Sequence, residues 1–206
     1  ETSPIDSVYA NALLNIYRKS KISDVKIEQR DKIKYTYKLS SKAIQYITNT
    51  VNDIQKKLPN VSNIPFTQDS ERITVIGDLH GQFSTLLHIV TEGPQGDLAI
   101  GNDSNGMRRR YIFVGDYINR ESDSLPIVML AYAMKCAFPD DVFLIRGNHE
   151  TTGNTAYMSI NLSREVNLRY PKESKTVLGY ITNSFKYLPI GYVIDRSIIV
   201  VHAGVG

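Results

Sequence analysis

Residues 142–150, VFLIRGNHE, join an apolar run directly to a polar end. The first four residues have the β-branched and aromatic composition of a buried strand. Arg146, Asn148, His149 and Glu150 then follow almost without a spacer. A guanidinium, an amide, an imidazole and a carboxylate are costly to bury unless each finds a partner. Their grouping at one strand end therefore indicates a functional site whose other members come from distant parts of the chain.

The same pattern occurs twice upstream. Residues 72–81, RITVIGDLHG, and residues 110–120, RYIFVGDYINR, each end a strand-like run on Gly-Asp and further polar residues. A helical apolar stretch follows each of them, at 83–90 and at 125–138. Strand, loop and helix in repeated order are typical of an α/β domain, which builds its sites at the carboxyl ends of its strands.

A fourth polar strand end lies near the end of the sequence. Residues 197–204, SIIVVHAG, form an apolar run that stops at His202, and residues 191–195, GYVID, form another. The three residues that link them, Asp195 to Ser197, predict a tight hairpin. Both strands are apolar enough for us to expect burial on both faces.

The remaining segments predict helices and connections. Periodicity indicates helices over 3–19 and 40–58, a short strand over 32–39, and helical structure from 151 to about Tyr187. The charged residues 17–35 are expected to be a linker or a solvated face. The segment 59–65 is expected to break the chain, and 92–110, with its solvated arginines at 108–110, to form a surface loop. We divide the chain into an accessory helix with a charged arm, 1–38, and an incomplete catalytic domain, 39–206.

Composition narrows the class of protein. Of 206 residues, 42% are hydrophobic and 22% are charged, as in an ordinary globular protein. No apolar run reaches the roughly 20 residues of a membrane-spanning helix, and a net charge of +3 is too small to indicate nucleic acid or a membrane as partner. The single cysteine, Cys136, lies in a helical apolar stretch and is expected in the core. Because a single cysteine cannot form a disulfide within the chain, the sequence favours a reducing compartment, cytoplasmic or nuclear.

The four strand ends together supply a set of metal-binding side chains. Its members are Asp78, His80, Asp116, Asn148, His149 and His202. Carboxylate, imidazole and amide donors in this mixture suit divalent transition metals without selecting one. Glycines beside them permit sharp turns and close approach of the backbone.

In combination, these motifs resemble the phosphoprotein phosphatase family of Ser/Thr phosphatases, within the calcineurin-like metallophosphoesterases. That family's GDxHG, GDxVDRG, GNHE and HGG or HAG stand here as GDLHG, GDYINRE, GNHE and HAG, and the resemblance covers residues 39–206. It implies an α/β fold: a β-sandwich flanked by helices, with a βαβαβ core, of which this sequence carries the N-terminal two-thirds. It also implies hydrolysis of phosphoserine and phosphothreonine in proteins, by direct attack of a hydroxide bound to two metal ions.

The resemblance further implies the metal ligands. Two divalent or trivalent transition metal ions, Mn, Fe or Zn, are expected. Asp78 and His80 would bind the first ion, Asn148 and His202 the second, and Asp116 would bridge the two.

The catalytic roles are implied in the same way. His149 is the expected general acid for the leaving alkoxide, and Arg120 and Arg146 are the expected clamps on the phosphate oxygens, for which guanidinium geometry is well suited. Two positions depart from the family pattern. Asn119 stands where the family has an aspartate that pairs with the GNHE histidine, so we expect His149 to be a weaker acid. Glu121 stands where the family has glycine, and we expect it to draw Arg120 away from phosphate.

The sequence stops at VHAGVG, whereas family members continue and supply a further histidine ligand and another arginine. None of the histidines here replaces that ligand, and His88 is expected to be structural. The chain is therefore expected to be a fragment, one piece of a nicked protein, or a truncated form without activity. Expected partners are a phosphoprotein substrate and either a regulatory subunit or the missing C-terminal segment. Two alternative functions remain open: nucleotide polyphosphate hydrolysis, and a non-catalytic pseudophosphatase scaffold.

Overall fold

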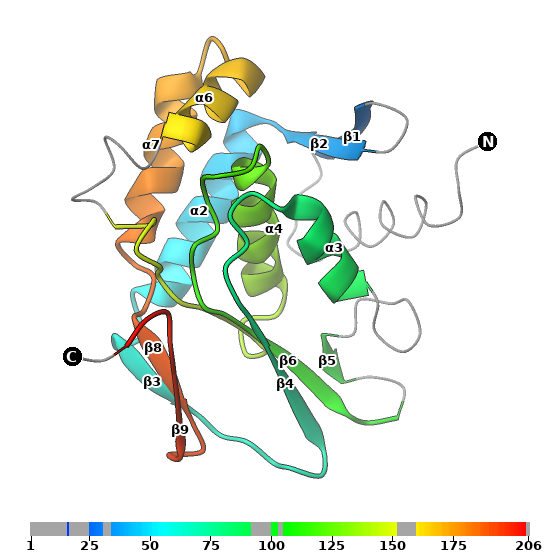
Figure 1. Cartoon of the computed structure of the whole chain (residues 1–206), viewed down its shortest axis with the longest axis vertical. Helices are drawn as coiled ribbons and strands as arrows, with labels where there is room; N and C mark the ends of the chain where they lie inside the picture. The colour runs from blue at the N-terminus through cyan, green and yellow to red at the C-terminus, as the bar shows by residue number, and fades with distance from the viewer. Residues whose placement is uncertain are drawn as a thin grey trace.

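In the computed structural model, the helices lie together in the upper part of Figure 1 and most of the strands lie in the lower part. The described residues are 16, 25–30, 34–91, 100–102, 105–151 and 160–204. The predicted helix at 3–19 and the proposed domain division at residue 38 lie largely outside this part. The described helices are α2 (Ser41–Gln55), α3 (Phe83–Thr91), α4 (Ser124–Ala137), α6 (Ile160–Arg169) and α7 (Ser174–Phe185).

The strands among the described residues form three separate sheets. They are β1 (Val25–Arg30), β2 (Lys34–Leu39), β3 (Val61–Ile64), β4 (Glu71–Ile76), β5 (Gly101–Asn102), β6 (Arg108–Phe113), β7 (Val142–Leu144), β8 (Gly191–Ile194) and β9 (Ile198–Val201). In the central sheet, β6 pairs in parallel with β4 and β7 and antiparallel with β5. In the second sheet, β8 pairs in parallel with β3 and forms the predicted hairpin with β9. β1 and β2 form an antiparallel pair.

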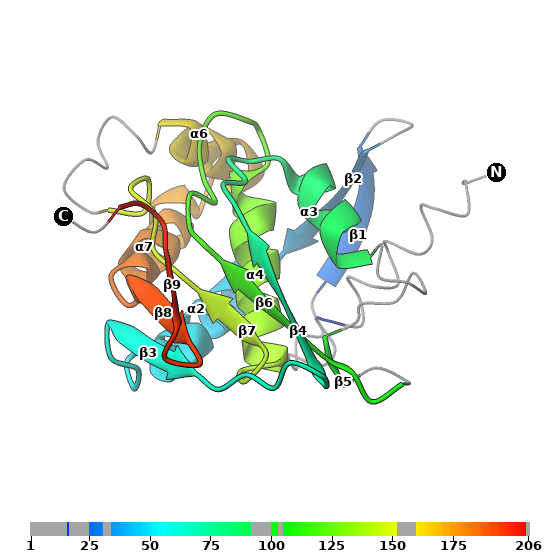
Figure 2. The same cartoon turned by 60° about the horizontal axis from the view of Figure 1, so that its bottom comes forward.

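The register of the central sheet positions the site. Ile76 of β4 pairs with Phe113 of β6, and Phe113 pairs with Leu144 of β7. The three parallel strands therefore end level with one another, and the loops that follow them begin at the same edge. Figure 2 shows β4, β6 and β7 side by side, with β8 and β9 next to them.

Two apolar cores lie on opposite faces of β6. Tyr111 and Phe113 belong to the large core beneath the helices, whereas Ile112 belongs to a smaller core shared with Tyr192 and Val200 of the second sheet. This alternation follows from the two-residue period of a strand. It makes β6 the common wall between the helical layer and the β8–β9 hairpin.

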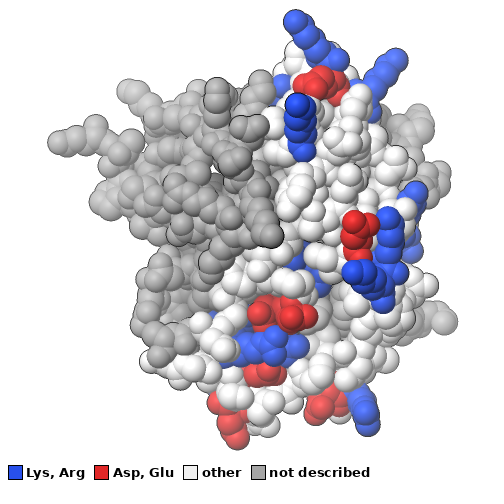
Figure 3. All heavy atoms as spheres, turned by 180° about the vertical axis from the view of Figure 1, so that it is seen from behind, with Lys and Arg blue, Asp and Glu red and all other residues white. Residues whose placement is uncertain are grey.

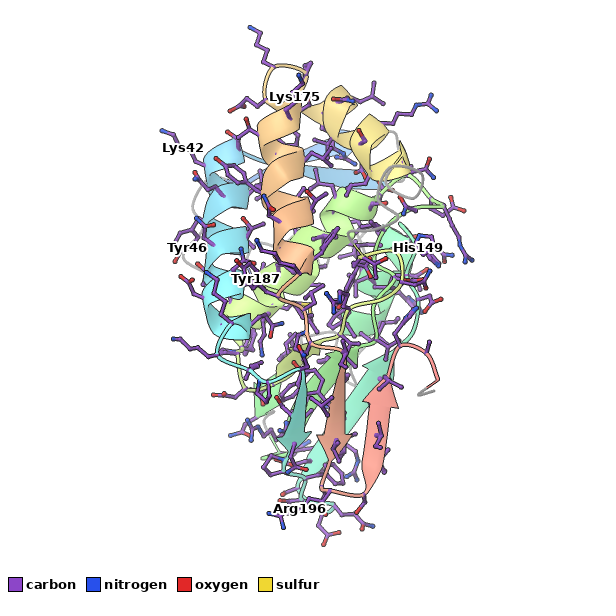
Figure 4. The ribbon with its side chains drawn as sticks, turned by 90° about the vertical axis from the view of Figure 1, so that its left-hand side faces the viewer. Lys42, Tyr46, His149, Lys175, Tyr187 and Arg196 are labelled. Atoms are coloured by element: carbon purple, nitrogen blue, oxygen red, sulfur yellow. The ribbon has the colours of Figure 1, made fainter. Side chains whose placement is uncertain are left out.

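Helix α4 occupies the centre of the large core. Every residue from Ser124 to Lys135 is buried, and the helix contacts α2, α3, α6 and β7. The hydroxyl groups of Tyr132 and Ser184 hydrogen bond at 2.8 Å and join α4 to α7. Cys136 packs against this core, as predicted. Helix α2 begins where Ser40 accepts a hydrogen bond from the Ala43 amide, and Figure 4 shows it alongside α7.

Several expectations about connections were wrong. Residues 25–30, expected as linker or solvated face, form β1, and the expected break at 59–65 contains β3. Only Ile64 of β3 is buried, so the strand lacked an alternating pattern. β9 is not buried on both faces, because Ile198 and Ile199 are 60% and 61% exposed.

Two of the three arginines expected to be solvated, Arg108 and Arg110, are instead paired. Arg110 is buried and binds Glu71 at 3.1 Å, and Arg108 binds Asp141 at 2.6 Å. Pairing with these carboxylates offsets the cost of removing the guanidinium groups from water. On the face shown in Figure 3, acidic and basic side chains are likewise intermingled.

Among the described residues, no helix has both the length and the apolar composition needed to cross a membrane.

Candidate active site

The polar strand ends predicted from the sequence meet at one place. The loops after β4 and β6 bring in Asp78, His80 and Asp116, and the end of β9 brings in His202. His80 Nε2 lies 3.7 Å from Asp78 Oδ2 and 3.4 Å from Asp116 Oδ2. His202 Nε2 lies 3.5 Å from Asp116 Oδ1 and 2.8 Å from the amide oxygen of Asn148, in the loop after β7. Residues more than a hundred positions apart thus surround one carboxylate.

Two groups of possible metal ligands share this carboxylate. One consists of His80, Asp116 and His149, and the other of Asp78, Asp116 and His202. Within each group the ligand atoms lie within 4.8 Å of one another. Asp116 belongs to both groups, but the groups separate Asp78 from His80, which were expected to bind the same ion. His149, predicted as an acid rather than a ligand, lies in the first group as well.

The donor atoms fit cations. Nδ1 of His80 donates to the Ile118 carbonyl at 2.9 Å, which leaves a lone pair on the buried Nε2. That atom has no hydrogen-bond partner although it faces two carboxylates. Nδ1 of His202 donates to the Val114 carbonyl at 2.9 Å and likewise leaves Nε2 facing acceptors. Lone pairs directed at anions repel each other, so a positive ion between them would satisfy both histidines.

The backbone around these ligands adopts an unusual conformation. His80 and Asp116 have φ of 42° and 52°, the left-handed region that side-chain-bearing residues seldom occupy. Gly115 has φ of 99°, and a Cβ atom there would lie 2.2 Å from the amide nitrogen of Gly147. Only glycine permits this close approach of the loops after β6 and β7.

Glu150 holds the same two loops together. Its carboxylate accepts hydrogen bonds from the amides of Asp116 (2.8 Å), Tyr117 (3.0 Å) and Gly147 (3.0 Å). The side chain is 0% exposed, and burial raises its pKa to about 7 although the three amides favour the charged form. The sequence placed Glu150 beside the site but gave it no role. Its position directly after three polar residues was the available signal.

His149 approaches the shared carboxylate from the side. Its Nε2 lies 3.9 Å from Asp116 Oδ2, its amide donates to Asp116 Oδ1 at 3.0 Å, and its ring meets that of His80 edge to face. Nδ1 lies 3.0 Å from the side-chain amide nitrogen of Asn119. Burial lowers the pKa of His149, the charges of His80, Arg120 and His202 lower it further, and Asp116 opposes them.

A profile of the family described as Calcineurin-like phosphoesterase matches residues 71–205, which is more than half of the chain. The chain belongs to the calcineurin-like phosphoesterase family. The predicted fold class and family are thereby confirmed.

Relatives within this family are named as protein phosphatases. The serine/threonine-protein phosphatase rdgC of Drosophila melanogaster is 31% identical over 202 residues, 98% of this chain and 26% of that protein. The human serine/threonine-protein phosphatase with EF-hands 2 is 32% identical over 78% of this chain and 20% of that protein. The structure of a Saccharomyces cerevisiae protein serine/threonine phosphatase with similarity to human phosphatase PP5 matches with a TM-score of 0.70 and 26% identity, over 82% of this chain and 49% of that one.

The chain therefore spans between a fifth and about a quarter of the length of the first two relatives and about half of the solved structure.

The two departures from the family motif have different outcomes. Asn119 does contact His149, in place of the aspartate that the motif predicts. Arg120 and Glu121 form no ion pair with each other within the described part of the chain, and the expectation that Glu121 draws Arg120 away from phosphate stays a prediction. Arg120 is exposed, whereas Arg146 is half-buried and its amide donates to the Pro189 carbonyl. His88 lies on the exposed side of α3 and is in neither ligand group.

Proposed function

We propose that the protein carrying this chain hydrolyses phosphoserine and phosphothreonine in protein substrates with the help of two bound transition metal ions, Mn, Fe or Zn. The observation that supports this most is the position of Asp116, whose carboxylate belongs to both groups of ligands. The resemblance assigns Asp78 and His80 to one metal site and Asn148 and His202 to the other. Asp78 lies near both histidines, 3.7 Å from His80 and 3.8 Å from His202. Similarity to proteins named as serine/threonine-protein phosphatases favours this substrate class.

The metal ions, when bound, would neutralise phosphate charge and acidify a water molecule for attack. The chain's own residues have the remaining tasks. The side-chain nitrogen of Asn119 donates to Nδ1 of His149, so a neutral imidazole carries its proton on Nε2. That nitrogen points toward Asp116, the centre of the site. When the ring is in its imidazolium form, Nε2 is placed to give its proton to a departing serine or threonine oxygen, which returns the ring to the neutral form.

Phosphate binding is assigned to two arginines. Arg120 lies close enough for its charge to lower the pKa of His149, and no carboxylate neutralises its guanidinium group among the described residues. Arg146 directly precedes the loop that carries Asn148 and His149. Charge-assisted, two-point contacts from these groups would orient the phosphoryl oxygens. A regulatory subunit, or a further segment of the same gene product, is the proposed second partner.

The test combines metal analysis with activity of the intact protein. Its metal content would be measured as purified, after chelation, and after refilling with Mn, Fe or Zn, and each preparation would be assayed on a phosphoserine peptide. We expect peptide hydrolysis to disappear with the metals and to return with at least one of them. Full activity of the chelated protein would refute the proposal.

The contact between Asn119 and His149 favours a second candidate, a nucleotide polyphosphate hydrolase of the same superfamily, since such enzymes commonly lack a carboxylate at this position. Parallel assays with a dinucleotide polyphosphate and the phosphopeptide separate the two activities. Asn119 also favours a third candidate role, that of a non-catalytic scaffold. A protein that is purified without metal and that manganese does not refill would support that role.

A further inference from the structure

A hollow of about 360 Å³ adjoins the candidate active site at Arg120. One wall is the loop after β6, which contributes Arg120 and Glu121, and the other is α6, which contributes Arg164 and Leu168 among others. Because Arg120 is both a proposed phosphate ligand and part of this wall, a substrate bound at the metals would extend directly into the hollow. We propose that the hollow is a subsite for one acidic residue of the substrate, close in sequence to the phosphorylated residue, an inference that rests on the proposed phosphatase function.

The walls of the hollow are firmly held. Arg169 of α6 contacts Asp123 at 3.0 Å and Glu165 at 2.9 Å, and Glu165 accepts a hydrogen bond from the Leu125 amide at the start of α4. On the opposite wall, the amide of Glu121 donates to the His80 carbonyl at 2.9 Å. The loop and the helix are thus each fixed to neighbouring parts of the fold, and a ligand need not order them on binding.

The charged side chains that line the hollow indicate the charge of the ligand that it suits. Arg169 is paired with both Glu165 and Asp123. Arg120 and Arg164, in contrast, have no ion-pair partner in the part of the chain that the structure describes. Glu121 is the remaining carboxylate of the lining. Within the lining, Arg120 and Arg164 against Glu121 leave one excess cation, and Asp123 behind Arg169 reduces the net charge further. The two exposed guanidinium groups therefore suit one carboxylate of the ligand better than a phosphate dianion.

Shape agrees with charge. Leu168 is 71% exposed on the rim of the hollow, where it offers an apolar contact to the methylene groups of a glutamate side chain. The volume admits a short stretch of extended peptide and is too small for a folded partner. A glutamate near the phosphorylated residue therefore satisfies the hollow in both charge and size.

The experiment compares phosphoserine peptides that differ in one residue. Glutamate is placed at one, two or three positions on either side of the phosphoserine, and each peptide is matched with its alanine counterpart. The intact protein is compared with Arg164→Glu and with the control Arg196→Glu, whose position at the tip of the β8–β9 hairpin is remote from His149 in Figure 4. We expect a threefold to tenfold preference, roughly the range of one or two exposed ion pairs, for glutamate at one position. Arg164→Glu should abolish the preference, and Arg196→Glu should keep it.

Two readouts separate this inference from the proposed function. Hydrolysis of p-nitrophenyl phosphate and of the alanine peptides tests phosphatase activity alone. Fluorescence anisotropy of the same labelled peptides measures their binding even in the absence of turnover. Equal kcat/KM and equal affinity for all peptide pairs would overturn the subsite, as would a preference that survives Arg164→Glu.

Discussion

Removal of the Glu150 carboxylate should destabilise the protein severely. Glu150→Ala would leave the amides of Asp116, Tyr117 and Gly147 without their acceptor in a fully buried place. An unsatisfied buried amide costs about 1–3 kcal/mol. Three of them, with partial relief from water that enters the space, give about 3–6 kcal/mol. That is a large share of the roughly 5–15 kcal/mol by which a domain is stable.

Glu150→Gln separates hydrogen bonding from shape. The amide oxygen of glutamine can replace Oε2, which accepts from Asp116 and Gly147, but its NH₂ group then faces the Tyr117 amide. One lost bond and a donor–donor contact should cost about 1–3 kcal/mol. Glu121→Gln, at an exposed position nearby, is the matched control and should change stability by less than about 0.5 kcal/mol.

The assay is urea unfolding of the intact protein followed by circular dichroism, together with hydrogen exchange. Exchange at the three amides should accelerate in Glu150→Ala before global unfolding does. The reasoning is refuted if Glu150→Ala costs less than about 1 kcal/mol, a value within reach of one ordinary hydrogen bond. Equal effects of the alanine and glutamine variants would also refute it, because shape alone would then explain the loss.

Three further predictions concern the site and the core. Asn119→Asp should raise phosphatase turnover in the intact protein by placing a carboxylate beside His149; unchanged or reduced turnover would contradict our interpretation of this departure. Asp116→Asn should remove bound metal and activity together, whereas His149→Asn should slow turnover and leave the metal content intact; the reverse pattern would exchange their roles. Burial lowers the pKa of Lys135 to about 8 from 10.5, so the unfolded state binds more protons between these values and stability should rise with pH there, on the order of 1 kcal/mol from about pH 8 to about pH 9.5. Urea unfolding at both pH values checks this, and Lys135→Met should lack the rise.

Local patterns predicted the parts of the fold that place the site. Strand runs that end on Gly-Asp or on Arg-Gly-Asn-His carried enough signal for β4, β6 and β7, and for the convergence of the loops that follow them. β3 was missed because its pairing with β8 joins Val61 to Gly191, a contact that no local pattern records. β1 was missed because charge obscured the alternation of Val25 and Ile27.

In the site, as in the fold, residues within local motifs were predicted from the sequence, and contacts with residues distant along the chain were not. Motifs named Asp78, His80, Asp116 and His202, yet the sequence said nothing of the backbone carbonyls that orient both histidines. The ion pairs of Arg108 and Arg110 depend on Asp141 and Glu71, which lie more than thirty residues away along the chain. Such partners become visible only when the strands are assembled.

The left-handed backbone at His80, Asp116, Asn119 and Arg120 limits how this site can change. Asparagine and aspartate tolerate that conformation and exchange readily there, whereas β-branched residues do not. If evolution or engineering replaced the side chains at these positions, only a few residue types would fit the backbone conformation. Asparagine at 119, where the family motif has aspartate, is one of these residue types, and it leaves Nδ1 of His149 beside an uncharged amide in place of a carboxylate.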